Sequence, residues 1–339
     1  TYACYETLLD THILPEFGDT PLRYISSASV YTFSEKLKQQ GLSPRTIKNL
    51  LILFHSILRY GEKQGYLNLS QLEFRYPKIN TSPFQLISHE HLTKLITVLS
   101  AEDSEFPIGI LLCIYTGIRV GELSGIRWED IDFDNKILKV SRQIQWKVVK
   151  RSGRKIAATN GTSESDGYWY FCEPKYKSYR VVDLDNDILV ILEREKKKQE
   201  KSQAYYEEYY TRYYSDEKLY SGGKMPNDYI IPENRISDEK NEYEVNFVIR
   251  RENGTYINSR TTTHYTRVVR EKLGIKDFDM HSLRHTHATM LMENGVDLVY
   301  IQHRLGHKDV KVTMNIYTNH MTEKIVNSNN EKLNNIYKQ

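Results

Sequence analysis

A proline-containing segment at residues 76–88 divides this chain into two parts with different hydrophobic patterns. The segment reads Tyr-Pro-Lys-Ile-Asn-Thr-Ser-Pro-Phe-Gln-Leu-Ile-Ser, and its two prolines and polar residues are typical of an interdomain linker. At 339 residues the chain is too long for one ordinary core and about right for two domains. We therefore expect a first domain over 1–80, a linker over 81–88 and a second domain over 89–339.

The first part, residues 1–75, has the spacing of helices. Ser43 and Pro44 form a typical helix start before an apolar stripe that runs from Arg45 to Lys63. The stripe consists of Ile47, Leu50, Leu51, Phe54, Ile57 and Leu58. The basic residues Arg45, Lys48, Arg59 and Lys63 fall largely outside it. Such a cationic face is either simply solvated or binds a polyanion such as DNA.

In the second part, the spacing of the apolar residues changes twice, from helical to strand-like and back to helical. Helical spacing begins after Ser88 and again over 106–115, whereas residues 137–184 alternate as strands do, with turn glycines between them. Residues 215–245 have the composition of a loop-rich insertion, 247–249 predict one short strand, and residues from Thr261 onward return to helical spacing. The pattern predicts a multidomain, mainly α protein whose second domain is α+β with a small antiparallel sheet.

Residues 187–214 predict a polar helix that is unusually rich in tyrosine. Its tyrosines form two series spaced four residues apart, which we interpret as a surface or self-packing helix in preference to a base-stacking platform. The two series are Tyr205, Tyr209, Tyr213 and Tyr206, Tyr210, Tyr214.

Composition excludes several classes of protein. With 39% hydrophobic and 27% charged residues the chain is globular, and no apolar stretch approaches the ~20 residues of a membrane span. Three widely separated cysteines predict a reducing cytosol and no disulfide framework. The net charge of +3 does not by itself indicate a nucleic-acid partner. Asp130-x-Asp132-x-Asp134 lacks the glycine and glutamate of a calcium loop, and no phosphate-binding glycine loop is present.

The segment from His281 to His287 is the most informative one. On a helix, His281, Arg284 and His285 share a face. An arginine beside histidines repels a metal ion but suits a phosphate, because the guanidinium binds two phosphate oxygens and the imidazole adds a donor that titrates near neutrality. A metal site built from His281, His285 and His287 is disfavoured, because the Arg284 guanidinium among them would repel the ion.

Three further elements are unremarkable when taken alone. Arg119 follows Thr116-Gly-Ile and has Glu122 one helical turn later, which fits an ordinary salt bridge. His307 follows Leu305-Gly306, and Tyr317 is one of 26 tyrosines.

In combination these elements resemble the tyrosine recombinases and integrases. That family has an Arg after Thr-Gly-x, a Lys in a β-hairpin, His-x-x-Arg, Leu-Gly-His and then a Tyr about ten residues later. Here they appear in order as Arg119, Lys175, His281 with Arg284, His307 and Tyr317. Glu173-Pro-Lys175 and the residues after Arg284 look closest to integrases of conjugative transposons and phages.

The resemblance implies a fold and a partner. Residues 1–80 would form a helical core-DNA-binding domain and 89–339 the catalytic domain, with insertions near 147–170 and 205–245. Relatives usually carry an arm-site-binding domain before this region, so we expect a truncated chain. Four protomers would act on two double-stranded DNA duplexes in the bacterial cytoplasm, with an excisionase or DNA-bending factor and no membrane. Arg45, Lys48 and Arg59, together with the basic run Lys147, Lys150 and Arg151, are candidate DNA-binding residues.

The residue types also define a chemistry. Arg119, Arg284, His281 and His307 supply donors for a phosphodiester transition state, and Tyr317 is the nucleophile beside them. His281 is our first choice for taking the tyrosine proton.

The resemblance assigns the general acid to the hairpin lysine, Lys175, with Lys177 as the alternative, and makes Glu122 a carboxylate that orients the arginines. No metal or other cofactor is expected. The alternatives are a type IB topoisomerase, which shares this chemistry, and a non-catalytic DNA-binding regulator on the same fold.

Overall fold

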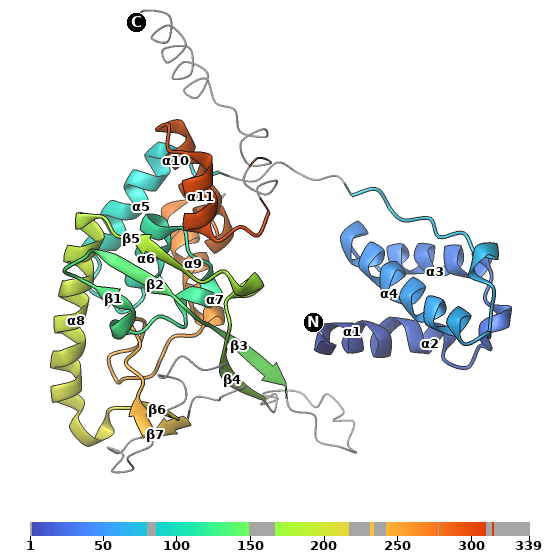
Figure 1. Cartoon of the computed structure of the whole chain (residues 1–339), viewed down its shortest axis with the longest axis horizontal. Coiled ribbons are helices and arrows are strands. Elements are labelled where there is room, and N and C mark those ends of the chain that lie inside the picture. The colour runs from blue at the N-terminus through green and yellow to red at the C-terminus, as the bar shows by residue number, and fades with distance from the viewer. Residues whose placement is uncertain are drawn as a thin grey trace, which may run out of the picture. The chain divides into compact units, whose positions relative to one another are not determined.

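The computed structural model describes residues 2–79, 86–148, 167–216, 231–233, 242–276, 278–309 and 314. The chain folds into two compact units, Thr1–Ser82 and Pro83–Gln339 (Figure 1). No helix within these described ranges has the length and apolar character that crossing a membrane requires.

The first unit is helical throughout its regular structure. Its helices are α1 (Tyr2–Leu8), a π-helical turn (Leu9–Ile13), α2 (Leu14–Phe17), α3 (Ser27–Gln39) and α4 (Pro44–Lys63). Phe17, Phe33 and Phe54 form its aromatic centre, with ring centroids 4.5 Å apart for Phe17 and Phe54. Burial of such rings supplies much of the stabilisation available to a small helical core.

Helix α4 begins as its sequence predicts. The Ser43 hydroxyl accepts a hydrogen bond from the Thr46 N–H, and Pro44 occupies the first turn. The apolar stripe is buried against the rest of the unit, whereas Arg45 and Arg59 are exposed and Lys48 is half-buried. None of these three cations forms an ion pair with a described residue. Their helical positions place them on the side away from the core.

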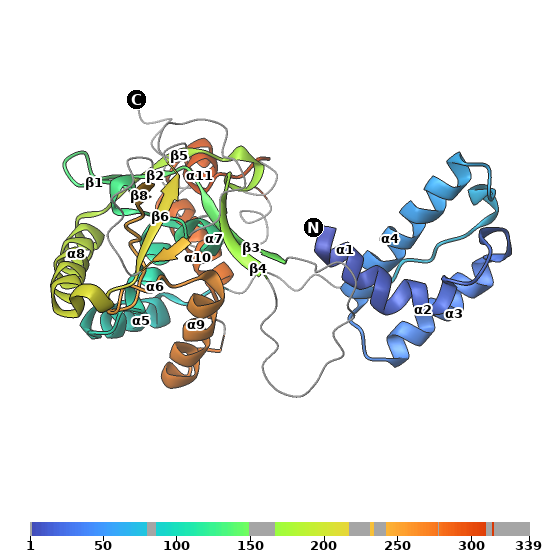
Figure 2. The ribbon, with the colours of Figure 1, turned by 90° about the horizontal axis from the view of Figure 1, so that it is seen from below.

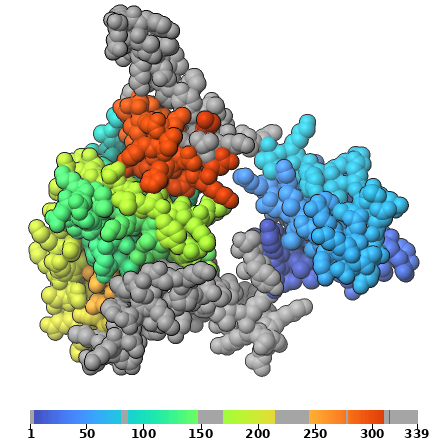
Figure 3. Space-filling model, in the orientation of Figure 1, coloured from blue at the N-terminus to red at the C-terminus, as the bar shows by residue number. Residues whose placement is uncertain are grey.

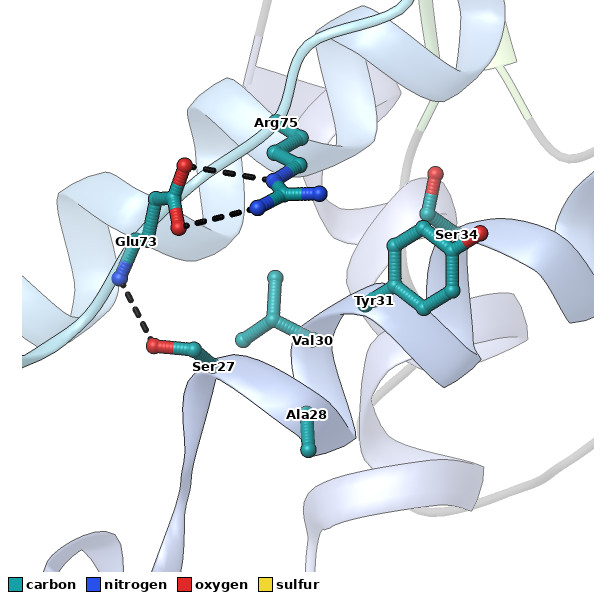
Figure 4. A pocket seen from close by; sticks show the side chains of 7 residues that line it. All are labelled: Ser27, Ala28, Val30, Tyr31, Ser34, Glu73 and Arg75. Carbon is teal, nitrogen blue, oxygen red and sulfur yellow. Dashed lines mark hydrogen bonds and ion pairs between the residues drawn. The ribbon is translucent and has the colours of Figure 1, made fainter.

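A pocket of about 230 Å³ lies in the first unit between α3 and the segment that follows α4 (Figure 4). Its two charged lining residues, Glu73 and Arg75, pair with each other at 3.2 Å. The Glu73 N–H also donates to the Ser27 hydroxyl, which fastens this segment to α3.

The second unit is built around the short helix α6 (Pro107–Thr116). Every residue of α6 except Tyr115 is buried, because α5 (His89–Ala101), α8 (Asn186–Tyr206), α9 (Ser259–Leu273) and α10 (Met280–Glu293) all pack on it. Figures 1 and 2 show α8 running along one side of this unit. Among the described residues, the other α-helices of this unit are α7 (Val120–Leu123) and α11 (Leu298–Leu305).

Three antiparallel sheets accompany the described helices. The first has the order β1-β2-β5, the second pairs β3 with β4, and the third has the order β7-β6-β8. The strands are β1 (Ile131–Asp132), β2 (Ile137–Val140), β3 (Gln143–Val148), β4 (Gly167–Cys172), β5 (Arg180–Asp183), β6 (Arg212–Asp216), β7 (Ile231–Glu233) and β8 (Glu242–Glu244). The expected mainly α fold with small antiparallel sheets is thus confirmed.

The first two sheets form one long hairpin with an interruption. Val140 pairs with Arg180 and Gln143 pairs with Cys172, so residues 141–142 on one side face residues 173–179 on the other. We call the longer side, Glu173–Tyr179, the lysine bulge. The predicted strands within 137–184 are therefore correct, and Lys175 lies in the bulge between β4 and β5.

The prediction of one helix over 187–214 is wrong. Helix α8 ends at Tyr206, and Tyr213 and Tyr214 belong to strand β6. The six tyrosines therefore do not form two rows along one helix. The reason is tertiary burial: Tyr210, Tyr213 and Tyr214 are buried, whereas Tyr205 remains 82% exposed. Packing of Tyr213 against the rings of Phe247 and Tyr256 outweighs the local helical preference.

The predicted insertion over 215–245 is also more ordered than expected where it is described. It supplies β7 and β8, which flank β6. The strand predicted at 247–249 is reduced to isolated bridges, from Phe247 to Arg127 and from Arg250 to Tyr256. Val245, at the end of the insertion, belongs to a second small core that also contains Ile144, Phe171, Tyr213 and Phe247.

Candidate active site

Four segments that are distant in the sequence meet at one place in the second unit. They are the turn from α6 to α7, the lysine bulge with the start of β5, helix α10, and the end of α11 with the loop after it. Figure 3 shows the red surface of α11 and its loop lying against the yellow-green surface of the 167–183 segment.

Two glycines permit this close approach. Gly117 (φ +67°) and Gly306 (φ +64°) end α6 and α11 in the left-handed conformation, which other residues adopt only with strain. A Cβ atom on Gly117 would lie 2.6 Å from the His287 ring, and one on Gly306 would lie 2.9 Å from both Arg180 and Ser178. The motifs Thr-Gly-x-Arg and Leu-Gly-His therefore contain glycine because the segments touch there.

Glu122 lies at the centre of the charged network and is 0% exposed. Its carboxylate accepts hydrogen bonds from the Arg119 N–H at 2.9 Å and from Arg119 Nη1 at 2.8 Å. It also accepts from both Nη atoms of Arg180, at 3.1 and 2.8 Å. Burial alone raises the pKa of a carboxyl, but the hydrogen bonds and charge of Arg180, with the charge of Arg119, outweigh it and hold the pKa of Glu122 below its usual range.

Arg180 is the site residue that sequence reasoning missed. Its side chain is only 1% exposed, and besides Glu122 it donates to the Arg304 carbonyl at 2.7 Å and to the Ser178 carbonyl at 3.1 Å. It thereby ties the Glu122 segment, the lysine bulge and the end of α11 together. The alternation of strand β5 could have identified Arg180, because it puts Arg180 on the same inward face as the buried Val182. A buried cation is rarely found without a partner, so Arg180 would have been expected to pair with a buried acid.

Arg119 and Arg284 reach the site from different elements, the turn from α6 to α7 and helix α10. Arg119 Nη2 donates to the Gly306 carbonyl at 2.8 Å, and its side chain keeps some exposure. Buried Arg284 donates to the Gly117 and Leu305 carbonyls. Burial, followed by the charge of Arg119, lowers the pKa of Arg284 to about 9, so the group stays protonated at neutral pH. Within the described ranges no carboxylate hydrogen-bonds to it, which leaves its charge available to an anion.

His281 and His307 lie beside these arginines. Burial and then the charge of Arg284 lower the pKa of His281, although Asp279 opposes the shift. Burial, Arg284 and Arg119 lower the pKa of His307 to about 3. Both imidazoles are therefore neutral at pH 7 when no anion is bound. The rings of His281 and His285 also contact each other edge to face, with 4.6 Å between their centroids, as their spacing on a helix predicts.

The two candidate lysines are both exposed on the lysine bulge. The charge of Lys175 is among those that lower the pKa of His281, so Lys175 lies within electrostatic range of that ring. Tyr317 lies outside the described residues, as do Lys150 and Arg151; Lys147 belongs to strand β3. Among the side chains that the structure describes, no three His, Cys, Asp or Glu residues gather in a way that could hold a metal ion.

His287 is a buried residue next to the site, and its contacts predict how the stability of the protein depends on pH. Its Nδ1 lies 2.9 Å from the Ile114 carbonyl, and its Nε2 accepts from Arg304 Nε at 3.2 Å, so its neighbours require the neutral ring. Burial, followed by Arg304, lowers the pKa of His287 to about 3. Because the unfolded chain binds a proton near pH 6.5 and the folded chain does not, stability falls as pH drops below 6.5.

At pH 5.5 the share of His287 in this loss is about 1.4 kcal/mol relative to pH 7.5. Urea unfolding measures the free energy of unfolding at both pH values. In His287→Gln, the loss of this free energy between pH 7.5 and pH 5.5 should be smaller than in the wild type by about that amount. The exposed His264 provides the control, since His264→Gln should leave the difference unchanged. An unchanged pH dependence in His287→Gln would contradict the assignment.

Comparison with known proteins gives a consistent result. The model of the phage integrase family matches residues 85–213 and 171–324. A tyrosine recombinase XerC-like protein of Caldanaerobacter subterraneus subsp. tengcongensis is 28% identical over 322 residues, covering 92% of this chain and 72% of that protein.

Two solved structures share the fold. The Tn1549 transposon integrase in complex with a circular intermediate DNA has a TM-score of 0.67 at 18% identity, covering 96% of this chain and 91% of that one. A lambda integrase tetramer bound to a Holliday junction has a TM-score of 0.57 at 16% identity, covering 93% and 70%.

Proposed function

The chain belongs to the phage integrase family, and from this premise we propose that it is a site-specific DNA recombinase that excises and integrates a mobile genetic element. The observation that carries the proposal is the convergence of Arg119, Arg284, His281 and His307 on one place, with the Glu122 carboxylate turned inward and fully paired with arginines. Because the Glu122 carboxylate is buried and paired with arginines, the site is cationic and suits the negatively charged phosphodiester of DNA.

The proposed reaction is a transesterification. The Tyr317 oxygen attacks phosphorus, the phosphorus–O5′ bond breaks, and the protein becomes joined to the 3′ end of the cut strand. Neutral His281 takes the phenol proton, and the Lys175 ammonium gives a proton to the departing O5′. Arg119, Arg284 and the N–H of His307 stabilise the charge on the non-bridging oxygens. Attack by a 5′ hydroxyl from another strand reverses these steps and rejoins the DNA.

The partners follow from the family and from the fold it shares. Double-stranded DNA at the element ends and at the target would be bound by protomers that form a tetramer during exchange, as in the lambda integrase assembly. The outward face of α4, with Arg45, Lys48 and Arg59, would contact DNA phosphates. We place this activity in the bacterial cytoplasm, with an excisionase or a DNA-bending protein as an accessory factor.

A strand-exchange assay tests the function. A duplex recovered by binding selection from a random-sequence pool is prepared in two lengths with different labels and incubated with the protein in EDTA. We expect duplexes that carry one label from each parent. Relaxation of supercoiled DNA without exchange would favour a type IB topoisomerase, and binding without any covalent adduct would favour a regulator. Loss of activity in EDTA would contradict the metal-independent reaction.

A further inference from the structure

The lysine bulge contains two consecutive residues in the left-handed conformation, and neither is glycine. Tyr176 has φ +64° and Lys177 has φ +54°. Side chains with a Cβ atom adopt this region at a cost, and they stay there only where surrounding contacts hold them. In this conformation the Tyr176 ring lies next to the Lys175 ammonium group.

Hydrogen bonds fasten the C-terminal side of the bulge to the rest of the site and join the two ends of the bulge to each other. On the C-terminal side, Ser178 accepts hydrogen bonds from Arg180 Nη1 at its carbonyl, at 3.1 Å, and from Arg119 Nη1 at its hydroxyl, at 3.4 Å. Across the bulge, the Tyr179 hydroxyl donates to Glu173 at 2.9 Å. The backbone that carries Lys175 is therefore fixed, while the lysine side chain itself is exposed.

The Tyr176 ring lies within reach of two ammonium groups from different segments. Lys175 Nζ is 5.2 Å from the ring centroid, and Lys308 Nζ is 5.7 Å from it. Lys308 directly follows His307, so the ring connects the lysine bulge with the loop that carries this histidine. The face of an aromatic ring attracts cations, and the attraction strengthens when water is removed.

We propose that Tyr176 is a positioning residue for Lys175, because its ring holds the ammonium group close to the His307 loop and limits the otherwise flexible lysine stem. The proposal rests on the proposed function, in which Lys175 protonates O5′ as the phosphorus–O5′ bond breaks. DNA bound over the site would exclude water and make the contact stronger than it is in the free protein.

The test compares two DNA substrates in single-turnover cleavage. One is an ordinary duplex; the other has sulfur in place of the bridging O5′ at the cleaved bond. A thiolate leaves without a proton, so the sulfur substrate bypasses the general acid. On ordinary DNA, Tyr176→Leu should slow cleavage about three- to thirtyfold. On the sulfur substrate the same variant should cleave within about twofold of the wild-type rate.

Three reference variants make the result specific. Lys175→Ala should show the same pattern with a larger loss on ordinary DNA, about 10²–10⁴-fold. Tyr176→Phe keeps the ring and should stay close to wild type on both substrates, and so should Tyr205→Leu, which removes an exposed tyrosine of α8.

Equal slowing of both substrates by Tyr176→Leu, or no slowing of either, would overturn the proposal. Failure of the wild-type protein to form an adduct with either duplex would instead refute the proposed function.

Discussion

Replacing Tyr317 with phenylalanine is expected to abolish covalent attachment of the protein to DNA. The phenol oxygen is the atom that bonds to phosphorus, and a phenyl ring offers no replacement nucleophile. We expect adduct formation to fall by at least about 10⁴-fold, as for the loss of other catalytic nucleophiles. DNA affinity should change little, because the arginines that bind the phosphate remain in place.

The measurement uses a nicked duplex from which the cut fragment diffuses away, so that the adduct accumulates. Adduct is read on a denaturing gel and affinity on a native gel. Tyr176→Phe is the matched control, since it removes the hydroxyl of a tyrosine that lies close to the charged cluster. If the adduct persists in Tyr317→Phe and disappears in Tyr176→Phe, the nucleophile is Tyr176 and the role given to its ring is wrong.

Local pattern was sufficient to predict most of the secondary structure of this chain. Helix α4 follows directly from its apolar stripe and its Ser-Pro start, and the strands within 137–184 follow from alternation. Strand β6 escaped prediction because its tyrosines are also acceptable in a helix. What selects the strand is burial of Tyr213 against Phe247 and Tyr256, which lie more than thirty residues further along the chain. No local pattern contains that information.

In the candidate site, too, some residues could be predicted from local sequence and others depend on contacts between distant segments. Short motifs identified Arg119, His281, Arg284 and His307, and the structure brings all four together. Arg180 belongs to no such motif. Its role arises from contacts with Glu122 and Arg304, which are 58 and 124 positions away. The register of the hairpin, which sets the length of the lysine bulge, likewise depends on pairing across an insertion.

Replacing Glu122 with alanine is expected to cause the largest loss of stability among single changes at the site. The change would leave two guanidinium groups, Arg119 and the fully enclosed Arg180, without their acid. Removing one partner of a buried ion pair typically costs 3–5 kcal/mol, so we expect the free energy of unfolding to fall by about that amount. Urea unfolding at pH 7.5 measures it.

The pKa of Glu122 fixes the sign of the accompanying pH effect. Because the folded-state pKa lies below the usual carboxyl value, the stabilisation is present at neutral pH and is lost as pH falls through that folded pKa. The stability difference between wild type and Glu122→Gln should therefore narrow in acid. Glu195 provides the contrast: burial raises its pKa, and it hydrogen-bonds to Gln199 instead of an arginine. Glu195→Gln should therefore cost little stability.

Stability and catalysis can be separated in the Glu122 variants. Glu122→Gln keeps the side-chain shape and an acceptor oxygen but loses the charge, so it should remain folded at a temperature where cleavage can be measured. If Glu122 holds Arg119 in the orientation that the transition state requires, single-turnover cleavage should drop about ten- to hundredfold while DNA affinity stays the same. A folded Glu122→Gln protein that cleaves at the wild-type rate would mean that Arg119 is held well enough by the Gly306 carbonyl and Ser178. The buried carboxylate would then serve the fold alone, since its loss would change the stability of the arginine network without changing the chemistry.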